Sequence, residues 1–339
     1  MKRLSLVFLL PAALLVLGSC SGRHPVAGIL FETDLGNDVD DVLALDLVLK
    51  EGEKTGIRLL DLGTHRPGPT DALYADASLA WYGFPDIPVG ESHVLDTVLH
   101  AVPDYTAAVM AMKAPDGSPL FGTVREGYED PVKMHRRVLA AQKNASVVFL
   151  STGFACELAR LLESGPDECS PLTGVELVKK KVRFLSIMCG STRPDYAEFN
   201  VKNDIPAMQK VFEAWPTPIY VTPFEIGVIS RYPASAIEND FGWADGGHPM
   251  VEAYKAYLPM PYDRPVWDVL AAAWIFHPEM FSLSAPGRVS IDDRGCTAFR
   301  EDPKGVHYLL ELNKEQANAL IDYMIAQTTR EPAARAANR

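Results

Sequence analysis

The sequence has few cysteines, no excess of basic residues and, beyond its first twenty residues, no long apolar run. Five cysteines are scattered through 339 residues, and no two have the CxxC spacing of a zinc site, so they are most simply buried apolar residues. The net charge of −12 and the pI of about 5.2 argue against nucleic acid or an anionic membrane surface as a general partner. The absence of a later apolar run excludes a spanning helix. A small-molecule enzyme and cation binding are both compatible with this composition.

The N-terminal residues have the pattern of a targeting signal. Lys2 and Arg3 precede the apolar stretch Leu4–Leu17, and the sequence Leu17-Gly18-Ser19-Cys20 is similar to a bacterial lipobox. We therefore predict a lipoprotein signal peptide over residues 1–19, lipidation of Cys20 and a tether over residues 20–27. The acyl chains would hold an exported protein at a membrane, on the periplasmic side or at the outer membrane. A plain secretory signal with a coincidental cysteine is the alternative.

The rest of the chain alternates between apolar runs, polar loops and helical patterns. Strands are predicted at 29–31, 59–62, 87–90, 147–150, 182–188 and 219–221, and helices at 42–50, 72–82, 132–143, 156–163, 207–213 and 266–276. After Gly287 the sequence suggests strands and a last helix near 315–326. This order predicts an α/β fold, with an open, mostly parallel β-sheet flanked by helices and a Rossmann-like core. A single large domain over residues 28–327 would be followed by a polar, disordered tail over residues 328–339.

The most informative stretch is Ile29–Leu45, in which a short apolar strand leads into an acidic loop and then a helix. Asp34, Asp38, Asp40 and Asp41 lie within eight residues, and their carboxylates repel one another unless something neutralises them. A hard divalent cation with oxygen ligands is the simplest neutraliser. Acids at a helix start are also common as caps, which explains one or two of these residues but not all four.

Other polar clusters also directly follow predicted strands. Thr64-His65, Ser151–Gly153 and Glu198–Asn200 all occupy such positions. Because ligands of open α/β sheets bind outside the carboxyl ends of the strands, these clusters can converge on one pocket. His65 is as compatible with a surface position as with a functional one.

Four islands of the sequence together resemble the inosine–uridine type of ribonucleoside hydrolases. The first is Glu32-Thr33-Asp34-Leu35-Gly36-Asn37-Asp38-Val39-Asp40-Asp41, which is similar to the family's DxDxGxDD loop, although Glu32 replaces the first aspartate and two residues are inserted after Gly36. The others are Leu150–Ala159, which looks like the turn TGPLTNLA, Ala197–Asn200 with Asn203-Asp204 and Pro206-Ala207, and Val266–Ala271. The resemblance spans residues 29–276 and implies a nucleoside hydrolase-like fold.

The resemblance also implies a division of roles. Asp34 would be general base and Ca²⁺ ligand, and Asp41, Asp268 and the backbone carbonyl of Cys156 would be further ligands, with Asp38 as an alternative created by the insertion. Asp40 and Asn200 would hold ribose hydroxyls and Glu198 the 5′ hydroxyl. For Asp268 the simpler interpretation is a helix cap, and for Asn200 and Glu198 it is a loop hydrogen bond.

Trp267 stands where many family members carry a histidine that protonates the leaving base. Tryptophan has no titratable proton to give, and the purine-preferring branch is similar in placing an aromatic residue there to stack on the base. The resemblance therefore implies a preference for purine nucleosides, with Trp267 as a substrate-binding residue. A tryptophan that merely packs the core is the alternative.

Together these features predict a Ca²⁺-dependent nucleoside N-ribohydrolase that cleaves a purine ribonucleoside to base and ribose for purine salvage. Its partner would be a small-molecule nucleoside, with no nucleic acid, membrane contact only through the lipid on Cys20, and a homo-oligomer left open. One alternative is an exported hydrolase of another ribosyl or glycosyl compound, and another is a non-catalytic nucleoside- or sugar-binding lipoprotein. A phosphatase of the DxD type is disfavoured because Glu32 replaces the nucleophilic first aspartate.

Overall fold

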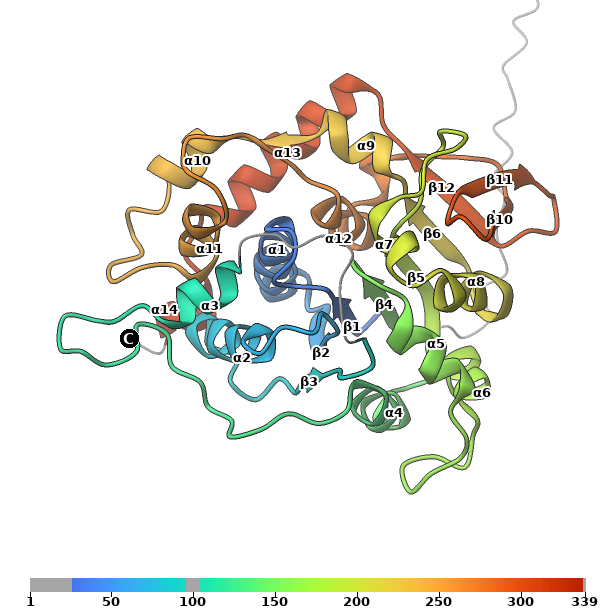
Figure 1. The fold of residues 1–339 in the computed structure, drawn as a ribbon, viewed down its shortest axis with the longest axis horizontal. Helices are drawn as coiled ribbons and strands as arrows, with labels where there is room; N and C mark the ends of the chain where they lie inside the picture. The colour runs from blue at the N-terminus through green and yellow to red at the C-terminus, as the bar shows by residue number, and fades with distance from the viewer. Residues whose placement is uncertain (1–25, 96–103, 338–339) are drawn as a thin grey trace, which may run out of the picture.

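The computed structural model describes residues 26–95 and 104–337, which form a central mixed sheet with helices on both faces (Figure 1). The strand order is β11-β10-β12-β6-β5-β4-β1-β2-β3, with β9 paired to β12. All neighbouring strands from β12 to β3 are parallel, whereas β9, β10 and β11 form an antiparallel edge. The strands of the parallel part are β1 (Gly28–Thr33), β2 (Arg58–Thr64), β3 (Val89–Glu91), β4 (Val147–Ser151), β5 (Val182–Met188), β6 (Ile219–Thr222) and β12 (His307–Glu311). The antiparallel edge consists of β9 (Ser282–Leu283), β10 (Gly287–Ile291) and β11 (Thr297–Glu301).

Alternation along the central strands sends side chains into two separate cores. Ile29 and Phe31 of β1 pack into one core, and Leu30 packs into the other. The first core contains residues of α1 (Asp40–Thr55), α2 (Asp71–Tyr82), α3 (Tyr105–Met110), α10 (Ala234–Asn239), α11 (Pro249–Tyr257), α12 (Asp268–Phe276) and α13 (Lys314–Thr328). The second contains residues of α4 (Pro131–Ala141), α5 (Cys156–Glu163), α6 (Gly174–Lys181) and α8 (Ile205–Ala214). Strands buried on both faces explain why their sequences are continuously apolar.

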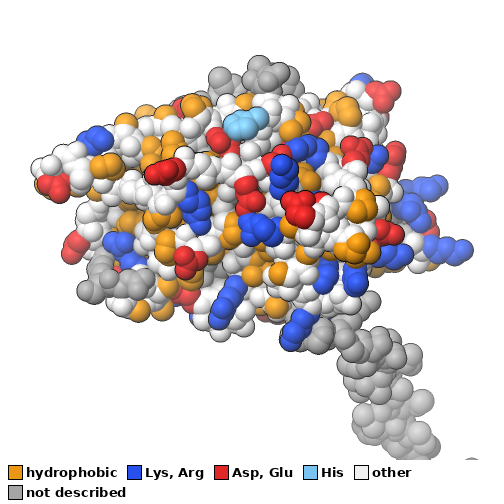
Figure 2. All heavy atoms as spheres, turned by 90° about the horizontal axis from the view of Figure 1, so that it is seen from below, with side chains coloured by type: hydrophobic (Ala, Val, Ile, Leu, Met, Phe, Trp, Pro, Cys, Tyr) orange, Lys and Arg blue, Asp and Glu red, His pale blue; other side chains and the backbone are white. Residues whose placement is uncertain are grey.

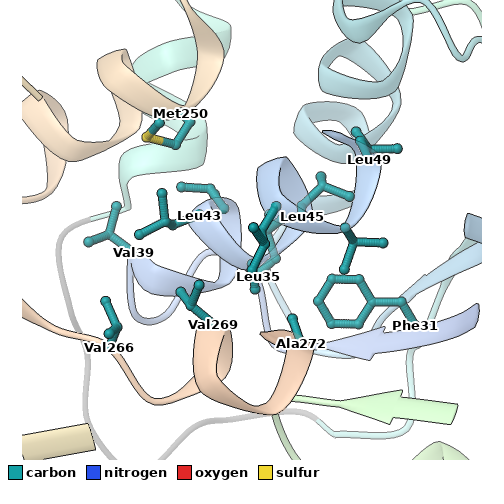
Figure 3. Packing of buried hydrophobic residues seen from close by; sticks show 14 of the residues in the cluster. Phe31, Leu35, Val39, Leu43, Leu45, Leu49, Met250, Val266, Val269 and Ala272 are labelled. Carbon is teal, nitrogen blue, oxygen red and sulfur yellow. The ribbon is translucent and has the colours of Figure 1, made fainter. Parts of the chain in front are cut away.

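Helices α1 and α12 form the centre of the first core. Residues 40–51 of α1 are all buried, and so are residues 268–275 of α12. Figure 3 shows apolar side chains of the β1–α1 region gathered opposite those at the start of α12, including Leu35, Val39, Leu43, Val266, Val269 and Ala272. This packing fixes the first turns of both helices relative to β1, so acidic residues in those turns are placed next to each other.

The order of the sheet reverses at β1. The strands that follow β1 directly, β2 and β3, lie on one side of it, and β4, β5 and β6 lie on the other. The loops after β1 and β4 therefore leave the sheet in opposite directions and open a crevice at the carboxyl ends of these strands. The β1–α1 loop and the turn before α5 both lie at this point, as predicted.

Most predicted elements are confirmed, with two differences. Predicted helices at 156–163 and strands at 182–188 have the same bounds in the structure, and the others differ at their ends. Short elements between β6 and α12 were not predicted, namely α9 (Phe224–Ile229), β7 (Arg231–Tyr232), α10, α11 and β8 (Arg264–Pro265), and neither were α6 and α7 (Phe199–Asn203).

The prediction of a disordered tail is wrong for the part of the tail that the structure describes. Residues 333–337 form helix α14 (Ala333–Ala337), and the guanidinium of Arg335 lies 3.8 Å from the ring centre of Trp81. Arg330 forms an ion pair with Glu53 at 3.0 Å. These contacts dock the tail onto α1 and α2, which its polar composition did not indicate.

No helix among the described residues is both long and apolar enough to cross a bilayer. On the face seen in Figure 2, acidic and basic side chains are intermingled with scattered apolar ones. The predicted signal peptide and Cys20 lie outside the described residues.

Candidate active site

A cavity of about 270 Å³ opens at the carboxyl ends of β1, β4 and β5. It brings together seven of the residues predicted from the sequence, which are Asp34, Asp38, Asp40, Glu198, Asn200, Trp267 and Asp268. The remaining lining residues are Asn37, Thr152, Met188, Phe199, Phe224, Tyr257 and Arg264. The sequence islands are up to 234 residues apart (34 to 268), so the topology of the sheet is what makes them neighbours.

The loop between β1 and α1 is held in place by the residues around it. Gly36 has a φ of +105°, a conformation that favours glycine, and its backbone N–H donates to the Tyr105 hydroxyl at 2.7 Å. The same hydroxyl donates to the carbonyl of Asp38 at 3.0 Å, and the backbone N–H of Leu35 donates to the hydroxyl of Thr33 at 3.0 Å. Tyr105 therefore spans the loop that carries the acidic cluster.

Four aspartates of the cluster are buried. Burial, and then the charges of neighbouring carboxylates, raise the pKa of Asp34, Asp40 and Asp268 well above the usual range. Burial also raises the pKa of Asp41 to about 7, although hydroxyls of Thr33 and Thr152 lower it. Without a cation, these carboxyl groups resist ionisation together.

Asp40 and Asp41 do not cap their own helix. The N-cap of α1 is Val39, and no side chain caps it. One carboxylate oxygen of Asp40 instead accepts the backbone N–H groups of Trp267 at 2.7 Å and Asp268 at 3.0 Å, at the start of α12. Asp40 therefore fixes the start of α12, and the cap interpretation of these acids is wrong for α1.

Asp41 is bound from the side of the sheet. Its Oδ1 accepts hydrogen bonds from the hydroxyls of Thr33 and, at 2.7 Å, Thr152. The second oxygens, Oδ2 of Asp41 and Oδ1 of Asp40, are buried without any hydrogen-bond partner among the described residues. An unpartnered buried carboxylate oxygen is unfavourable unless a cation or a substrate hydroxyl binds it.

This donor set fits a hard divalent cation. Asp34, Asp41 and Asp268 supply only carboxylate oxygens, which suit Ca²⁺ or Mg²⁺ better than zinc. Within the described residues no three His, Cys, Asp or Glu side chains are already drawn together as a metal centre. Mutually repelling carboxylates are expected to stand apart until a cation joins them. The burial and charge of these carboxyl groups, and their unpartnered oxygens, indicate the cation.

Asp38 lies apart from this cluster and faces Arg264. Nε of Arg264 donates to Oδ1 of Asp38 at 2.9 Å, and Nη2 donates to Oδ2. The pair is partly exposed, with side-chain exposures of 23% for Asp38 and 19% for Arg264. Asp38 therefore has a hydrogen-bonded counterion, whereas Asp34, Asp40, Asp41 and Asp268 form no ion pair within the described residues.

Glu198 and Asn200 also line the cavity. Glu198 caps α7 through the backbone N–H groups of Asn200 at 2.9 Å and Val201 at 3.3 Å, and it also accepts from Gly190 at 3.0 Å. Burial raises the pKa of Glu198 to about 7 despite these hydrogen bonds. The amide nitrogen of Asn200 donates to the carbonyls of Thr152 and Met188, both at 3.1 Å. The loop hydrogen bonds considered as alternatives are thus present, and both residues also line the cavity.

Trp267 is half-buried at the edge of the cavity. Its indole N–H donates to the carbonyl of Phe224 at 2.8 Å, and the two rings stack at 5.6 Å with an interplanar angle of 18°. A tryptophan held by a hydrogen bond and a stacked ring is a rigid aromatic wall. It packs, as the alternative interpretation holds, and it also lines the site.

Cys156 is buried in the first turn of α5 and does not line the cavity. Burial raises the pKa of its thiol well above the usual range, which keeps the sulfur protonated. The role of its backbone carbonyl as a ligand stays a prediction.

A second buried polar group lies directly behind the acidic cluster. Glu32 accepts from Nδ1 of His65 at 2.9 Å and bonds Nε2 of His135, whose Nδ1 lies 3.0 Å from Asp61. Nε2 of His65 accepts the backbone N–H of Phe154 at 2.8 Å. Gly153 lies between His65 and Asp34 with no room for a Cβ atom. The surface alternative for His65 is wrong.

Reasoning from the sequence missed several lining residues. Tyr257 is the last residue of α11, and Arg264 lies in the two-residue strand β8, in a stretch before α12 where the sequence has no periodic pattern. His135 lies on a predicted helix, where a lone histidine carries no signal of its contact with Glu32. Only the charge of Arg264 so close to the Val266–Ala271 island was a usable sign.

The comparisons with known proteins agree with this geometry. The sequence model of the inosine-uridine preferring nucleoside hydrolases matches residues 29–327. Among curated proteins, none matches the sequence significantly.

Solved structures share the fold at low sequence identity. A plant nucleoside hydrolase is 19% identical with a TM-score of 0.64, over 89% of this chain and 99% of its own. The purine-preferring ribonucleoside hydrolase from Gardnerella vaginalis is 16% identical with a TM-score of 0.67, over the same shares. The inosine-uridine preferring nucleoside hydrolase from Bacillus anthracis is 18% identical with a TM-score of 0.64, over 89% of this chain and 100% of its own.

The family match covers the whole sheet, including both helices whose first turns carry the acidic cluster. The predicted family and fold are therefore confirmed, as is the prediction of an enzyme rather than a binding lipoprotein. This chain belongs to the inosine-uridine preferring nucleoside hydrolase family and is an N-glycosyl hydrolase.

Proposed function

We propose that this enzyme hydrolyses purine ribonucleosides to base and ribose and that Ca²⁺ is its cation. The observation that carries the proposal is the buried cluster of Asp34, Asp41 and Asp268, whose carboxylates form no ion pair within the described residues. Asp34 and Asp268 line the same cavity as Trp267. Ca²⁺ is favoured over Mg²⁺ because it accepts the irregular, many-oxygen coordination that carboxylates, a backbone carbonyl and ribose hydroxyls can provide.

We assign the cation to Asp34, Asp41, Asp268 and the carbonyl of Cys156, and we assign Asp38 to Arg264, which binds both of its oxygens. A bound Ca²⁺ would lower the pKa of a water molecule and orient it. Asp34 accepts the proton of that water as its oxygen attacks C1′ of the ribose. Asn37, whose amide donates to Oδ2 of Asp34 at 3.2 Å, holds this carboxylate in place.

Ribose recognition is assigned to groups with free acceptor capacity. The unpartnered Oδ1 of Asp40 suits a ribose hydroxyl, Asn200 the 2′ or 3′ hydroxyls, and Glu198 the 5′ hydroxyl. A substrate that lacks such a hydroxyl would leave a buried carboxylate oxygen unpaired, which makes these contacts selective.

The purine preference rests on the aromatic wall of the cavity. Trp267, Phe224 and Tyr257 line the cavity and offer ring faces to a base. Stacking is stronger for a two-ring purine than for a pyrimidine, and Trp267 has no proton to donate to either. The Gardnerella vaginalis protein, described as purine-preferring, has the same fold.

Ribose release from a panel of purine and pyrimidine nucleosides tests this function, in the presence of Ca²⁺, Mg²⁺ or a chelator. We expect turnover of inosine, guanosine or adenosine that Ca²⁺ restores after chelation, and no turnover by Asp34→Asn. Faster turnover of uridine than of any purine nucleoside would refute the base preference. Turnover of other glycosides with none of nucleosides would favour the alternative of another ribosyl or glycosyl substrate.

We also propose that the enzyme is exported and anchored through a lipid on Cys20, on the basis of the sequence Leu17–Cys20. In a bacterial host, radiolabelled palmitate should be incorporated into the wild type and not into Cys20→Ser, and only the wild type should sediment with membranes. Secretion of an unlabelled, soluble wild-type protein would instead support a plain secretory signal.

A further inference from the structure

Arg264 is the one basic side chain among the described residues that line the cavity, whose other charged residues are all acidic. It precedes α12 in β8, and its guanidinium lies 5.1 Å from the ring centre of Tyr257 and 5.5 Å from that of Trp267. The guanidinium therefore lies beside two of the aromatic side chains that line the cavity.

The guanidinium is fixed and still has free donors. Asp38 takes one N–H from Nε and one from Nη2, and no acceptor among the described residues engages Nη1. An arginine has five N–H donors, so the outer edge of this group can still bind an acceptor in the cavity. Asp38 and the two rings limit its rotation, so a ligand would find these donors already oriented.

The residues assigned so far do not stabilise the negative charge that develops on the leaving base. When the C1′–N bond of a nucleoside breaks, its electron pair stays on the base, which becomes negatively charged. Apart from Arg264, the charged side chains that line the cavity are all carboxylates, and Trp267 has no titratable proton to offset the charge. A preoriented cationic donor in that cavity stabilises charge where it develops.

We propose that Arg264 is a catalytic residue that donates a hydrogen bond to a ring nitrogen or carbonyl oxygen of the departing purine, and that Asp38 is its positioning residue. The inference rests on the proposed function. The water oxygen bonds to C1′, its proton goes to Asp34, and the C1′–N pair remains on the base, which takes its proton from solvent. Arg264 transfers no proton.

This proposal gives the two inserted residues after Gly36 a role, which is to position Arg264 through Asp38. The insertion brings Asp38 opposite Arg264, although the buried acids of the cluster lie on either side of it in the sequence. An enzyme with tryptophan before its last aspartate would in this way replace proton donation by an oriented guanidinium.

The test compares two substrates that differ in how much help their leaving group needs. Inosine releases a strongly basic anion, whereas 4-nitrophenyl β-ribofuranoside releases a stable phenolate. Removal of one preoriented donor typically lowers kcat by about 10²- to 10³-fold. We expect Arg264→Gln to lose about that much on inosine and at least about tenfold less on the nitrophenyl riboside. Arg264→Lys should recover part of the loss, and Asp38→Asn should show the same preference for the activated substrate with a smaller loss.

Arg125→Gln is the control, because Arg125 is about as exposed as Arg264 and forms an ion pair with Asp76, and neither residue of that pair lines the cavity. It should leave the ratio of the two activities unchanged. Equal losses of Arg264→Gln on both substrates would overturn the proposal, and so would a loss confined to nucleoside 5′-phosphates, which would make Arg264 a phosphate ligand. If Arg264→Gln fails to fold, the Arg264→Lys and Asp38→Asn ratios decide. If the wild type cleaves neither substrate, the proposed function itself fails.

Discussion

Glu32 and Asp34 are buried acids two residues apart at the end of the same strand, and the protein treats them in opposite ways. Hydrogen bonds and charge from His135 and His65 overcome the effect of burial and lower the pKa of Glu32 to about 2. For Asp34, burial and three neighbouring aspartates all act in the same direction and raise the pKa well above the usual range. Glu32 is bound by two histidines, whereas the side chain that binds Asp34 within the described residues is the uncharged amide of Asn37.

The comparison shows that burial alone does not decide the state of a carboxyl group in this protein. Between Glu32 and Asp61, His135 is held by carboxylates on both sides, so its own pKa is raised well above the usual range and it carries a positive charge. The fold can therefore supply internal counterions where it needs them. Their lack around Asp34, Asp41 and Asp268 is the best reason to assign the compensating charge to a bound cation.

Asp34→Asn removes the uncompensated carboxylate and should have the largest effect of the substitutions considered. We expect kcat/KM for inosine to fall by about 10³-fold or more, because the variant loses both a general base and a cation ligand. The free energy of unfolding in chelator should stay the same or rise, because one of several repelling buried charges is gone. Purified variant and wild type are compared in ribose release and in urea unfolding with and without Ca²⁺.

Asp302→Asn is the control, since Asp302 pairs with Arg288 on the surface, and it should change neither quantity. A metal-free Asp34→Asn protein that is several kcal/mol less stable than the wild type would show that the cluster has internal compensation after all.

Glu32→Gln removes the charge of the carboxylate that His65 and His135 bind. Removal of one partner of a buried, hydrogen-bonded charge typically costs about 3–5 kcal/mol of stability, and here it leaves His135 with a single carboxylate. The loss is expected in urea unfolding with and without Ca²⁺ alike, and the stabilisation on adding Ca²⁺ should persist. The surface pair of Glu129 and Arg137 provides a control, Glu129→Gln, with a loss of at most about 1 kcal/mol. A Glu32→Gln protein as stable as the wild type would mean that burial of this network is not coupled to folding.

Without the cation, Asp41 and Glu32 should make the stability of the protein depend on pH in opposite directions. In chelator the folded-state pKa of Asp41, about 7, exceeds the unfolded value of 3.8, so its contribution to stability is full below 3.8 and is lost as the pH rises through about 7. The folded-state pKa of Glu32, about 2, lies below its unfolded value of 4.5, so its contribution is present above 4.5 and is lost as the pH falls through about 2. Chelated protein should therefore lose about 2–4 kcal/mol of stability between pH 4.5 and pH 8 through the cluster.

Saturating Ca²⁺ should reverse this trend, because the cation binds the ionised carboxylates. Groups that titrate in both conditions cancel in the difference between the two curves of unfolding free energy against pH, which isolates the cluster. If that difference did not change between pH 4.5 and pH 8, the cluster would not be the binding site.

The two acids also differ in how far the sequence reveals them. The strand, the acidic loop and the helix start were predictable because they depend on neighbours in the chain. The carboxyl-end rule placed Thr64-His65, Glu198 and Asn200 at the same edge, whereas Asp268 was placed there only by the family resemblance. The contacts of Glu32 with His65 and His135 were not predictable, because these residues lie 33 and 103 positions away in the sequence. Arg264 was missed because the stretch before α12 has no periodicity that indicates what its side chains contact.

In its hydrogen-bond partners Asp41 is intermediate between Glu32 and Asp34. The smallest predicted effect follows from removing one of these partners. The hydroxyl of Thr152 donates to Oδ1 of Asp41 at 2.7 Å, and that of Thr33 donates to the same oxygen, so this carboxylate has polar but uncharged partners. Thr152→Val keeps the shape of the side chain and removes one donor, which is worth about 1 kcal/mol. The ionised carboxylate is then less favourable, and calorimetric titration should show Ca²⁺ binding weakened by about fivefold. Thr152→Ser restores the hydroxyl and should restore most of the affinity. An equal loss in both variants would assign the effect to packing of the methyl group, and the hydroxyl would then contribute nothing to the charge of Asp41.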